Sequence, residues 1–270
     1  MGHHDPMCPA HRDEGEITAL GRASLILKQF RGAELPVSAA AVARSTGLPR
    51  ATAHRLLREL ARVGLLERVG TAFRPGLLLF ELGQLVPQPR SLHEAARKHM
   101  AVLHEATGHN VGLAVEQDGE VVHVEILRGE RAPRLPLRTG GRWPAHASCS
   151  GKVMLAFGPP AHVDRTLAKP LKRLTPRTIT DPDALRAELE RVRRARVAFD
   201  RQESFRDVTG VASPVFGPDG TVLAALSISG MAGRINLSRV DAAVRTTALA
   251  ITRELEMAES VVRPVLAPRR

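Results

Sequence analysis

The apolar positions of the first eighty residues recur at helical spacing. A stripe with members three to four residues apart predicts an amphipathic helix over residues 17–31 that ends at Gly32. Ser38 is expected to cap a short helix over 39–45, and Gly47 supplies a tight turn after it. The inward positions are Leu20, Ala23, Leu27 and Phe30 in the first helix and Ala40, Val42 and Ala43 in the second.

A third helix is predicted from Arg50 to Val63, apolar on one face and basic on the other. Two short extended runs follow, over 65–69 and 72–75, and Gly70-Thr71 between them indicates a β-hairpin. Helix, short helix, glycine turn, basic helix and hairpin is the plan of a winged helix-turn-helix. The inward residues of the basic helix are Ala53, Leu56, Leu57 and Leu60, and the opposite face carries Arg55, Arg58 and Arg62.

Residues 87–90, Pro-Gln-Pro-Arg, mark a boundary, and Ser91 with Glu94 forms a capping box that is expected to open the next helix. Gly108 ends that helix. Its apolar stripe fits either the core of one domain or a linker helix between two. The stripe consists of Leu92, Ala96, Met100 and Leu103.

The hydrophobic period changes to two after Asn110. Asp118-Gly119 is a strong hairpin signal between two such segments. Strands mixed with helices predict an α+β domain of about 150 residues. The expected inward residues are Leu113, Val115, Val122, Val124 and Ile126. The further elements are strands over 135–138, 211–216 and 221–229, a helix from about Ser150, a helix capped by Asp181, and a last helix over 240–257 capped by Ser238.

Composition places the chain among ordinary globular proteins. It has 270 residues, 43% of them apolar and 25% charged, and no apolar run of transmembrane length. The first sixteen residues are polar and predict a disordered tail rather than a secretion signal, so a cytoplasmic protein without membrane partners is expected. The tail residues His3, His4, Cys8 and His11 lack a second ligand pair, and no metal, cofactor or disulfide framework is expected.

The positive charge is concentrated near the start of the chain. The net charge is +11, and residues 17–80 carry ten Lys or Arg against three acidic residues. A basic module joined to a near-neutral domain is typical of nucleic-acid-binding proteins. The candidate DNA contacts are Arg50, Thr52, His54 and Arg55 in the groove and Arg58 and Arg62 on phosphates.

Three stretches of the second domain are candidates for a ligand site. Residues 140–152 form a glycine- and serine-rich loop that runs into a helix start, where free backbone N–H groups bind anions. Residues 199–203 place Asp200 and Glu203 in a loop. Period two puts Ser227 and Ser229 on the same face of one strand. From the residues alone, each stretch fits an ordinary loop or strand equally well.

Residues 37–83 resemble the DNA-binding domain of IclR-family bacterial transcriptional regulators. The resemblance rests on Gly47-Leu48-Pro49 followed by Thr52, His54, Arg55, Leu56 and Leu57. Phe73 stands where the family usually has Tyr, and Pro75 precedes Gly76 where Leu is common. Residues 108–258 resemble the GAF-like effector domain of the same family, on the segments PAHASCSGKVMLA (144–156), FDRQES (199–204), GVASPVFGPDG (210–220) and LAALSISG (223–230).

The resemblance implies a domain plan and an effector pocket. The plan is a disordered tail (1–16), a winged helix-turn-helix (17–86), a linker helix (87–108), a GAF-like effector-binding domain (109–260) and a loose tail (261–270). Cys149-Ser150 and Gly210 depart from residues common in the family, and Trp143 favours a flatter or aromatic effector. The implied pocket residues are Leu135, Trp143, Cys149, Ser150, Asp200, Gly210, Ser227 and Ser229.

The resulting hypothesis is a non-enzymatic, ligand-responsive transcriptional regulator. It is expected to bind a pseudo-palindromic operator in double-stranded DNA as a homodimer or homotetramer, with a small organic acid or aromatic metabolite as effector. One alternative is a thiol enzyme with Cys149 as nucleophile, His146 as base and Asp200 as orienting group. The other is a basic scaffold that binds DNA without sequence preference.

Overall fold

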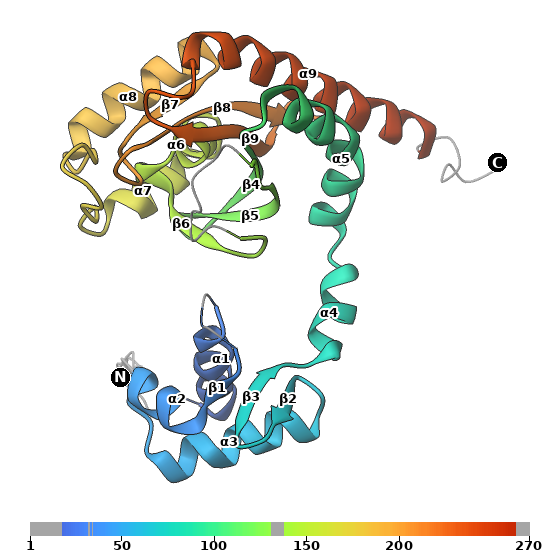
Figure 1. The fold of residues 1–270 in the computed structure, drawn as a ribbon, viewed down its shortest axis with the longest axis vertical. Helices are drawn as coiled ribbons and strands as arrows, with labels where there is room; N and C mark the ends of the chain where they lie inside the picture. Colours follow the sequence, from blue (N-terminus) through green and yellow to red (C-terminus); the bar gives the residue numbers. More distant parts are fainter. Residues whose placement is uncertain (1–17, 32, 34, 131–137, 263–270) are drawn as a thin grey trace, which may run out of the picture. The chain divides into compact units, whose positions relative to one another are not determined.

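The computed structural model of the chain describes residues 18–31, 33, 35–130 and 138–262. The chain divides into two compact units, residues 1–84 and 85–270, and each is described by itself (Figure 1). No helix in these described ranges combines the length and the apolar character needed to cross a membrane.

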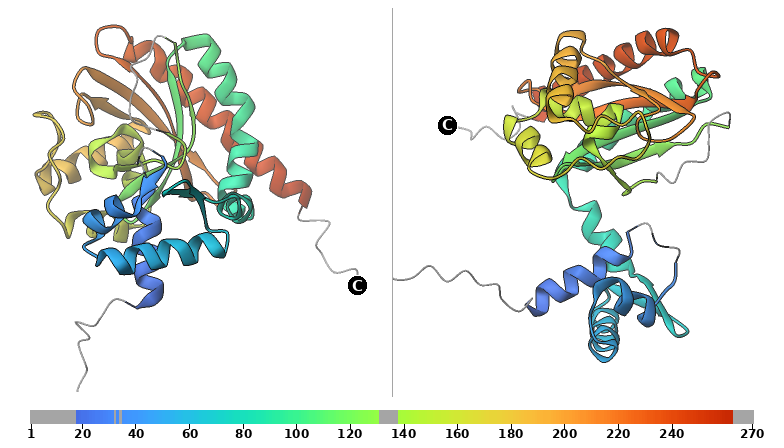
Figure 2. Two further views of the ribbon diagram at one scale, coloured as in Figure 1. Left: turned by 60° about the horizontal axis from the view of Figure 1, so that its bottom comes forward. Right: turned by 90° about the vertical axis from the view of Figure 1, so that its left-hand side faces the viewer.

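The first unit packs a bundle of short helices against a small sheet. Its core includes Ile26, Phe30, Val42, Leu57 and Phe73, all buried. The strands are antiparallel in the order β1-β3-β2, and the β2–β3 hairpin lies beside α3 (Figure 2). The elements are α1 (Ala19–Gln29), β1 (Val37–Ser38), α2 (Ala39–Thr46), α3 (Arg50–Arg62), β2 (Leu66–Val69), β3 (Ala72–Pro75) and α4 (Leu77–Gln84).

Local sequence explains the turn between α2 and α3. The Ser38 hydroxyl accepts a hydrogen bond from the backbone N–H of Ala41 at 3.2 Å and so caps α2, as predicted. Gly47 ends α2 with φ at 72°, a left-handed conformation that costs glycine little. Pro49 precedes α3, whose four predicted apolar residues are all buried. The helix-turn-helix and the hairpin are therefore confirmed.

Some details of the first unit differ from the sequence-based predictions. Leu20 is 84% exposed and Ala40 is also exposed, because α1 turns Ile26 toward the core and α2 turns Val42 and Ala43 toward it, the latter two as predicted. The helix α4 was not predicted. The expected stop of the first helix at Gly32 lies outside the described residues.

The second unit is built on an antiparallel sheet with strand order β6-β5-β4-β9-β8-β7. Helices α5 and α9 pack against each other, as Figure 1 shows, and cover one face of this sheet. Helices α6 and α8 cover the other face, which we call the α6 face. The elements are α5 (Pro87–Thr107), β4 (Asn110–Gln117), β5 (Glu120–Leu127), β6 (Arg142–Pro144), a short 3-10 turn (Ala145–Ala147), α6 (Cys149–Phe157), α7 (Pro160–Leu167), α8 (Pro182–Ala195), β7 (Ala198–Arg201), β8 (Val208–Phe216), β9 (Val222–Met231) and α9 (Leu237–Val262).

The apolar stripe of α5 belongs to the core of the second unit. Its predicted members are all buried against the sheet and α9. The helix begins at Pro87, not at Ser91, so the capping-box prediction is wrong. Proline suits this position because its missing N–H falls among the first-turn donors that have no partner within the helix. Gly108 ends α5 in the left-handed conformation, as predicted.

The later elements confirm most predictions and correct two. The β4–β5 hairpin, α6, the Asp181-capped α8, β8 and β9 are present. In β5 the most buried residues are Val121 and His123, not the expected Val122, Val124 and Ile126. The cap of α9 is Asn236, whose side-chain oxygen accepts from the N–H of Arg239, and not Ser238.

The strand predicted over 135–138 stays a prediction for most of its length. Residues 135–137 lie outside the described residues, and Arg138 is not in a strand. The strands β6 and β7 and the helix α7 were not predicted.

Candidate functional site

The exposed face of α3 carries the candidate DNA contacts. Arg50 and four others of these residues are exposed, and Thr52 is half-buried, while the opposite face of α3 packs in the core. Arg55 forms an ion pair with Glu59 at 2.8 Å, but both side chains are at least half exposed, so the pair contributes little energy and the guanidinium can exchange partners. The other exposed contacts are His54, Arg55, Arg58 and Arg62.

A groove follows this face of α3 and reaches the wing. It is lined by residues of α3 together with Arg68 of β2 and Phe73 of β3. The Arg68 side chain donates to the backbone oxygen of Gly70 at 2.8 Å, which places a further cation at the hairpin turn. Phe73 is buried in the core, so the family position that is usually Tyr serves packing here. Sequence reasoning missed Arg68, although its exposed position in a short hairpin could have indicated it.

In the second unit, strand register brings several predicted effector residues into one row. Asp200 of β7 pairs with Gly210 of β8, Gly210 pairs with Ser229 of β9, and Ser229 pairs with Asn110 of β4. Ser227 lies two residues from Ser229 and therefore on the same face, next to Gly112. Residues that alternate with these along their strands pack under α5 and α9, so the row lies on the α6 face.

Cys149 lies at the start of α6, over Gly210. A Cβ atom added at Gly210 would come within 3.2 Å of the Cys149 Sγ and 3.0 Å of the Ile228 backbone oxygen. The glycine therefore leaves the space that the cysteine fills. Burial and the nearby charge of Asp200 raise the pKa of the Cys149 thiol to about 12. The thiol stays protonated at neutral pH, which gives the thiol-enzyme alternative no support. Ser150, beside it, is also buried.

A small hollow opens on the α6 face beside Ser227 and Ser229. Its cavity volume is about 30 Å³, which is room for a water molecule and lies well below the range for small-molecule pockets. The hollow is lined by Asn110, Val111, Gly112, His123, Ile126, Arg128, Ser227 and Ser229.

His123 forms one wall of this hollow and was not predicted. Its side chain is buried, and within the described ranges its Nδ1 has no hydrogen-bond partner. Burial lowers the pKa of His123 to about 4, so the ring is neutral at pH 7. A buried polar atom without a partner is unusual in a native fold and points to a missing ligand or water.

An aromatic pair stands on the same side of the sheet. Trp143 of β6 stacks on Phe205 with ring centroids 4.3 Å apart. Trp143 is opposite Val121, two residues from His123 along β5. Its Nε1 is also buried and finds no partner among the residues that the structure describes. Phe205 was not predicted, because no local pattern connects it to Trp143.

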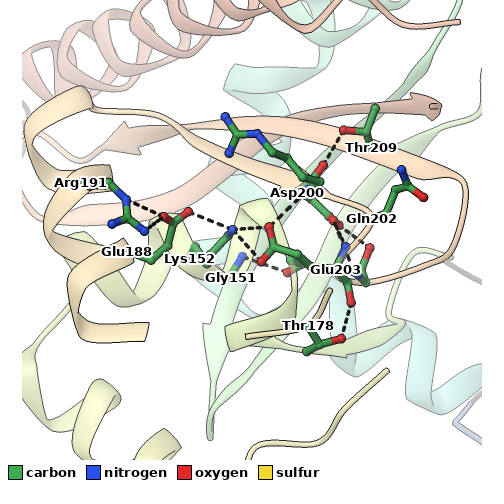
Figure 3. A network of polar contacts seen from close by, with 12 residues as sticks. Gly151, Lys152, Thr178, Glu188, Arg191, Asp200, Gln202, Glu203 and Thr209 are labelled. Carbon is green, nitrogen blue, oxygen red and sulfur yellow. Dashed lines mark hydrogen bonds and ion pairs between the residues drawn. The ribbon is translucent and has the colours of Figure 1, made fainter. Parts of the chain in front are cut away.

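A buried ion network anchors the loop that carries Phe205 (Figure 3). Lys152 of α6 is fully buried, and its Nζ lies 2.8 Å from Glu203 and 3.1 Å from Glu188 of α8. Arg191 pairs with Glu188 from outside at 2.7 Å. Burial of a lysine is tolerated because both carboxylates compensate its charge. The network therefore fixes α6, α8 and the loop after β7 relative to one another.

Asp200 is engaged within its own loop. Its carboxylate accepts hydrogen bonds from the backbone N–H of Glu203 at 2.7 Å and from the hydroxyl of Ser204. Burial raises the pKa of Asp200 to about 6, although these hydrogen bonds act in the opposite direction. Its backbone oxygen accepts from the Thr209 hydroxyl at 2.6 Å (Figure 3). These contacts assign Asp200 to holding the loop in shape.

The predicted effector residues thus fall into distinct groups. Ser227 and Ser229 line the hollow, and Gly210 and Cys149 adjoin it. Leu135 lies outside the described residues. In the described ranges, no group of three or more His, Cys, Asp or Glu residues is arranged to hold a metal ion. The tail residues His3, His4, Cys8 and His11 also lie outside those ranges.

A basic winged helix-turn-helix joined to a separate α+β domain with a small polar hollow indicates a DNA-binding regulator. Comparison with known families agrees. Residues 19–70 match the IclR helix-turn-helix domain, and residues 86–253 match the C-terminal domain of the bacterial transcriptional regulator IclR. The chain belongs to the IclR family of bacterial transcriptional regulators, with a DNA-binding domain and an effector domain.

Individual relatives span both domains. The transcriptional repressor IclR of Escherichia coli is 29% identical over 231 residues, which covers 84% of each chain. A crystal structure of an IclR homolog from Microbacterium hydrocarbonoxydans, complexed with 4-hydroxybenzoate, is 32% identical with a TM-score of 0.81 and covers 89% of this chain and all of that one. The Thermotoga maritima IclR structure is 28% identical with a TM-score of 0.68, covering 88% of this chain and 98% of that one.

Proposed function

We propose that this regulator binds operator DNA through the exposed face of α3 and that a small organic acid, aromatic or aliphatic, modulates this binding from the α6 face of the second unit. The operator is pseudo-palindromic, because a dimer presents two recognition helices to two half-sites. Arg50, Thr52, His54 and Arg55 contact the groove, and Arg58 and Arg62 contact phosphates. The groove between α3 and the wing, lined by exposed arginines, supports this assignment.

The observation that carries the effector proposal is the hollow on the α6 face. It combines hydroxyl, amide and imidazole groups with the apolar Ile126, and Arg128 at its rim offers a positive charge. A carboxylate near Arg128 and an apolar body against Ile126 describe a small organic acid. The complex of the Microbacterium homolog with 4-hydroxybenzoate supports the aromatic version of this proposal.

The predicted residues have different roles at this site. Ser227 and Ser229 contact the effector, and Trp143 closes the pocket together with Phe205. Cys149, Ser150 and Gly210 set the depth of the pocket, since Gly210 leaves the space that the thiol fills. Asp200 holds the loop that carries Phe205. Sequence also assigned Leu135 to this pocket, and the assignment stays a prediction.

The effector proposal is tested by the thermal stability of the whole chain with four candidate acids: 4-hydroxybenzoate, benzoate, lactate and propionate. A ligand that binds only the folded state raises the melting temperature in proportion to RT ln(1 + [L]/Kd). We expect at least one acid to raise it at millimolar concentration, and Ser229→Ala to reduce the rise. Ser213→Ala is the control, because its hydroxyl bonds to the backbone oxygen of Arg196, outside the hollow. No rise with any of the acids contradicts the proposal.

A further inference from the structure

Two buried ring nitrogens on the α6 face lack a hydrogen-bond partner among the residues that the structure describes. Nδ1 of His123 and Nε1 of Trp143 are both buried, and neither finds a hydrogen bond within the described ranges. They stand on the neighbouring strands β5 and β6, and Trp143 is paired with Val121, two residues from His123. Diagonal neighbours of this kind are within reach of one another's aromatic side chains. An unmade hydrogen bond at a buried atom is costly, so this corner of the site favours a polar partner.

We propose that His123 is a specificity-determining residue that selects effectors carrying an uncharged hydrogen-bonding group, a hydroxyl above all. This inference rests on the proposed function of the α6 face. It goes further than that function because it says which part of the site binds the hydroxyl of the effector and which part binds the carboxylate.

The surroundings of His123 decide the charge of the group it accepts. On its own strand the neighbouring inward residue is Val121, which is apolar and fully buried. Among the residues that line the hollow, the only permanent cation is Arg128, which is exposed at the rim. Among the described residues that line the hollow, no second cation is available to a carboxylate placed beside His123, and burying an unpaired charge is costly. The neutral ring therefore suits a hydroxyl, while the carboxylate stays near Arg128.

A hydroxyl also fits the donor and acceptor pattern. The indole nitrogen of Trp143 donates only, whereas a neutral imidazole has one donor and one acceptor nitrogen. A hydroxyl accepts from Trp143 and donates to an imidazole nitrogen with a single oxygen atom. A methyl group or hydrogen at the same place leaves both ring nitrogens unpaired. Sites built in this way reject analogues that lack the hydroxyl.

The test compares matched acids that differ by one hydroxyl: 4-hydroxybenzoate with benzoate, and lactate with propionate. Affinities are measured by calorimetry on the whole chain for the wild type, His123→Leu and His123→Asn. In at least one pair we expect the hydroxy acid to bind about tenfold more tightly to the wild type, the effect of one neutral hydrogen bond. His123→Leu removes this preference, and His123→Asn keeps part of it because its amide retains a donor and an acceptor near Cβ.

His93→Leu is the matched control. His93 of α5 pairs with Glu125 of β5 at 2.7 Å, on the opposite face of the sheet, so its loss leaves the preference unchanged. A wild-type preference that survives in His123→Leu overturns the inference and leaves the proposed function standing, as does equal binding of both members of each pair. Binding of none of the four acids overturns the proposed function itself, and the inference with it.

Discussion

The two units treat positive charge in opposite ways. In the first unit the arginines of α3 lie at the surface, and Arg55 is 62% exposed even though it pairs with Glu59. In the second unit Lys152 is fully buried between Glu188 and Glu203. Exposed cations are screened by salt and exchange partners, which suits reversible contact with DNA phosphates. A buried cation with two carboxylates fixes local structure. Basic residues are therefore exposed for the proposed DNA contacts in one unit and fix the local structure in the other.

Removing the buried cation is expected to have the largest effect. Lys152→Met leaves Glu188 and Glu203 without their partner and should lower the free energy of unfolding by about 3–5 kcal/mol. Denaturant titration measures the loss. The matched control is Lys98→Met. The ammonium of Lys98 pairs with Glu254 at the surface and should contribute little to the free energy of unfolding. Equal losses in the two variants contradict the comparison between buried and exposed charge.

His123 is expected to give the second unit a pH dependence. Its pKa in the folded protein is about 4, below the ordinary histidine pKa of 6.5. Its contribution to stability is therefore fully present above pH 6.5 and is lost as the pH falls toward 4. Between pH 7 and pH 4 the wild type should lose about 3 kcal/mol more than His123→Leu.

Asp200 opposes this trend over an overlapping range. Its folded pKa of about 6 exceeds the ordinary aspartate pKa of 3.8, so its contribution to stability is present below pH 3.8 and is lost as the pH rises through 6. Chemical denaturation at several pH values, with Asp200→Asn as the second comparison, separates the two groups. If the free energy of unfolding of the wild type and of His123→Leu varies with pH in parallel, His123 is not a buried histidine with a lowered pKa.

Packing gives a further contrast between the units. Gly210→Ala introduces a Cβ atom 3.2 Å from the Cys149 Sγ, so we expect a loss of about 1–3 kcal/mol from overpacking. Gly83→Ala in α4 of the first unit meets no atom within 4 Å and should not destabilise the protein. Adding Cys149→Ala to Gly210→Ala should restore part of the loss. If the double variant loses as much free energy of unfolding as Gly210→Ala alone, the Cys149 Sγ is not the cause of the overpacking.

The exposed arginines should affect DNA binding and not folding. Arg58→Ala is expected to weaken binding to all DNA sequences alike and to reduce the slope of log K against log salt concentration by about 1. Fluorescence anisotropy with a labelled duplex at several salt concentrations measures the slope. Arg191→Ala, which removes an arginine of α8 in the second unit, should leave the slope unchanged. A slope that Arg58→Ala does not alter removes Arg58 from the phosphate contacts.

The helices and strands of each unit were easier to predict from the sequence than the contacts that these elements make within the unit. The helix-turn-helix was predictable because Ser38 and Gly47 act locally and the apolar stripe of α3 is regular. The inward face of β5 was assigned wrongly because valines occupy both faces of that strand and both faces of the sheet are covered. The start of α5 was placed too late because the Ser91 signal competed with Pro87, a good first residue of a helix.

The candidate site was predictable where it lies on a recognisable strand or loop. Ser227 and Ser229 follow from the period of two in β9, and they do line the hollow. His123 was missed because a lone histidine in a strand carries no pattern of its own. Lys152 stood in the predicted loop, but its partners are 36 and 51 residues away in the sequence, and only the folded chain brings them together.

The central claim is that an effector bound by the second unit changes how the first unit binds a specific operator. The direct measurement is a selection of genomic DNA fragments by the purified whole chain at about 0.15 M salt, where non-specific binding is weak, with and without the acid that raises the melting temperature most. We expect enrichment of a short palindrome, and the amount of that DNA recovered should differ between the two conditions. Enrichment of no sequence in either condition, or the same yield in both, contradicts it.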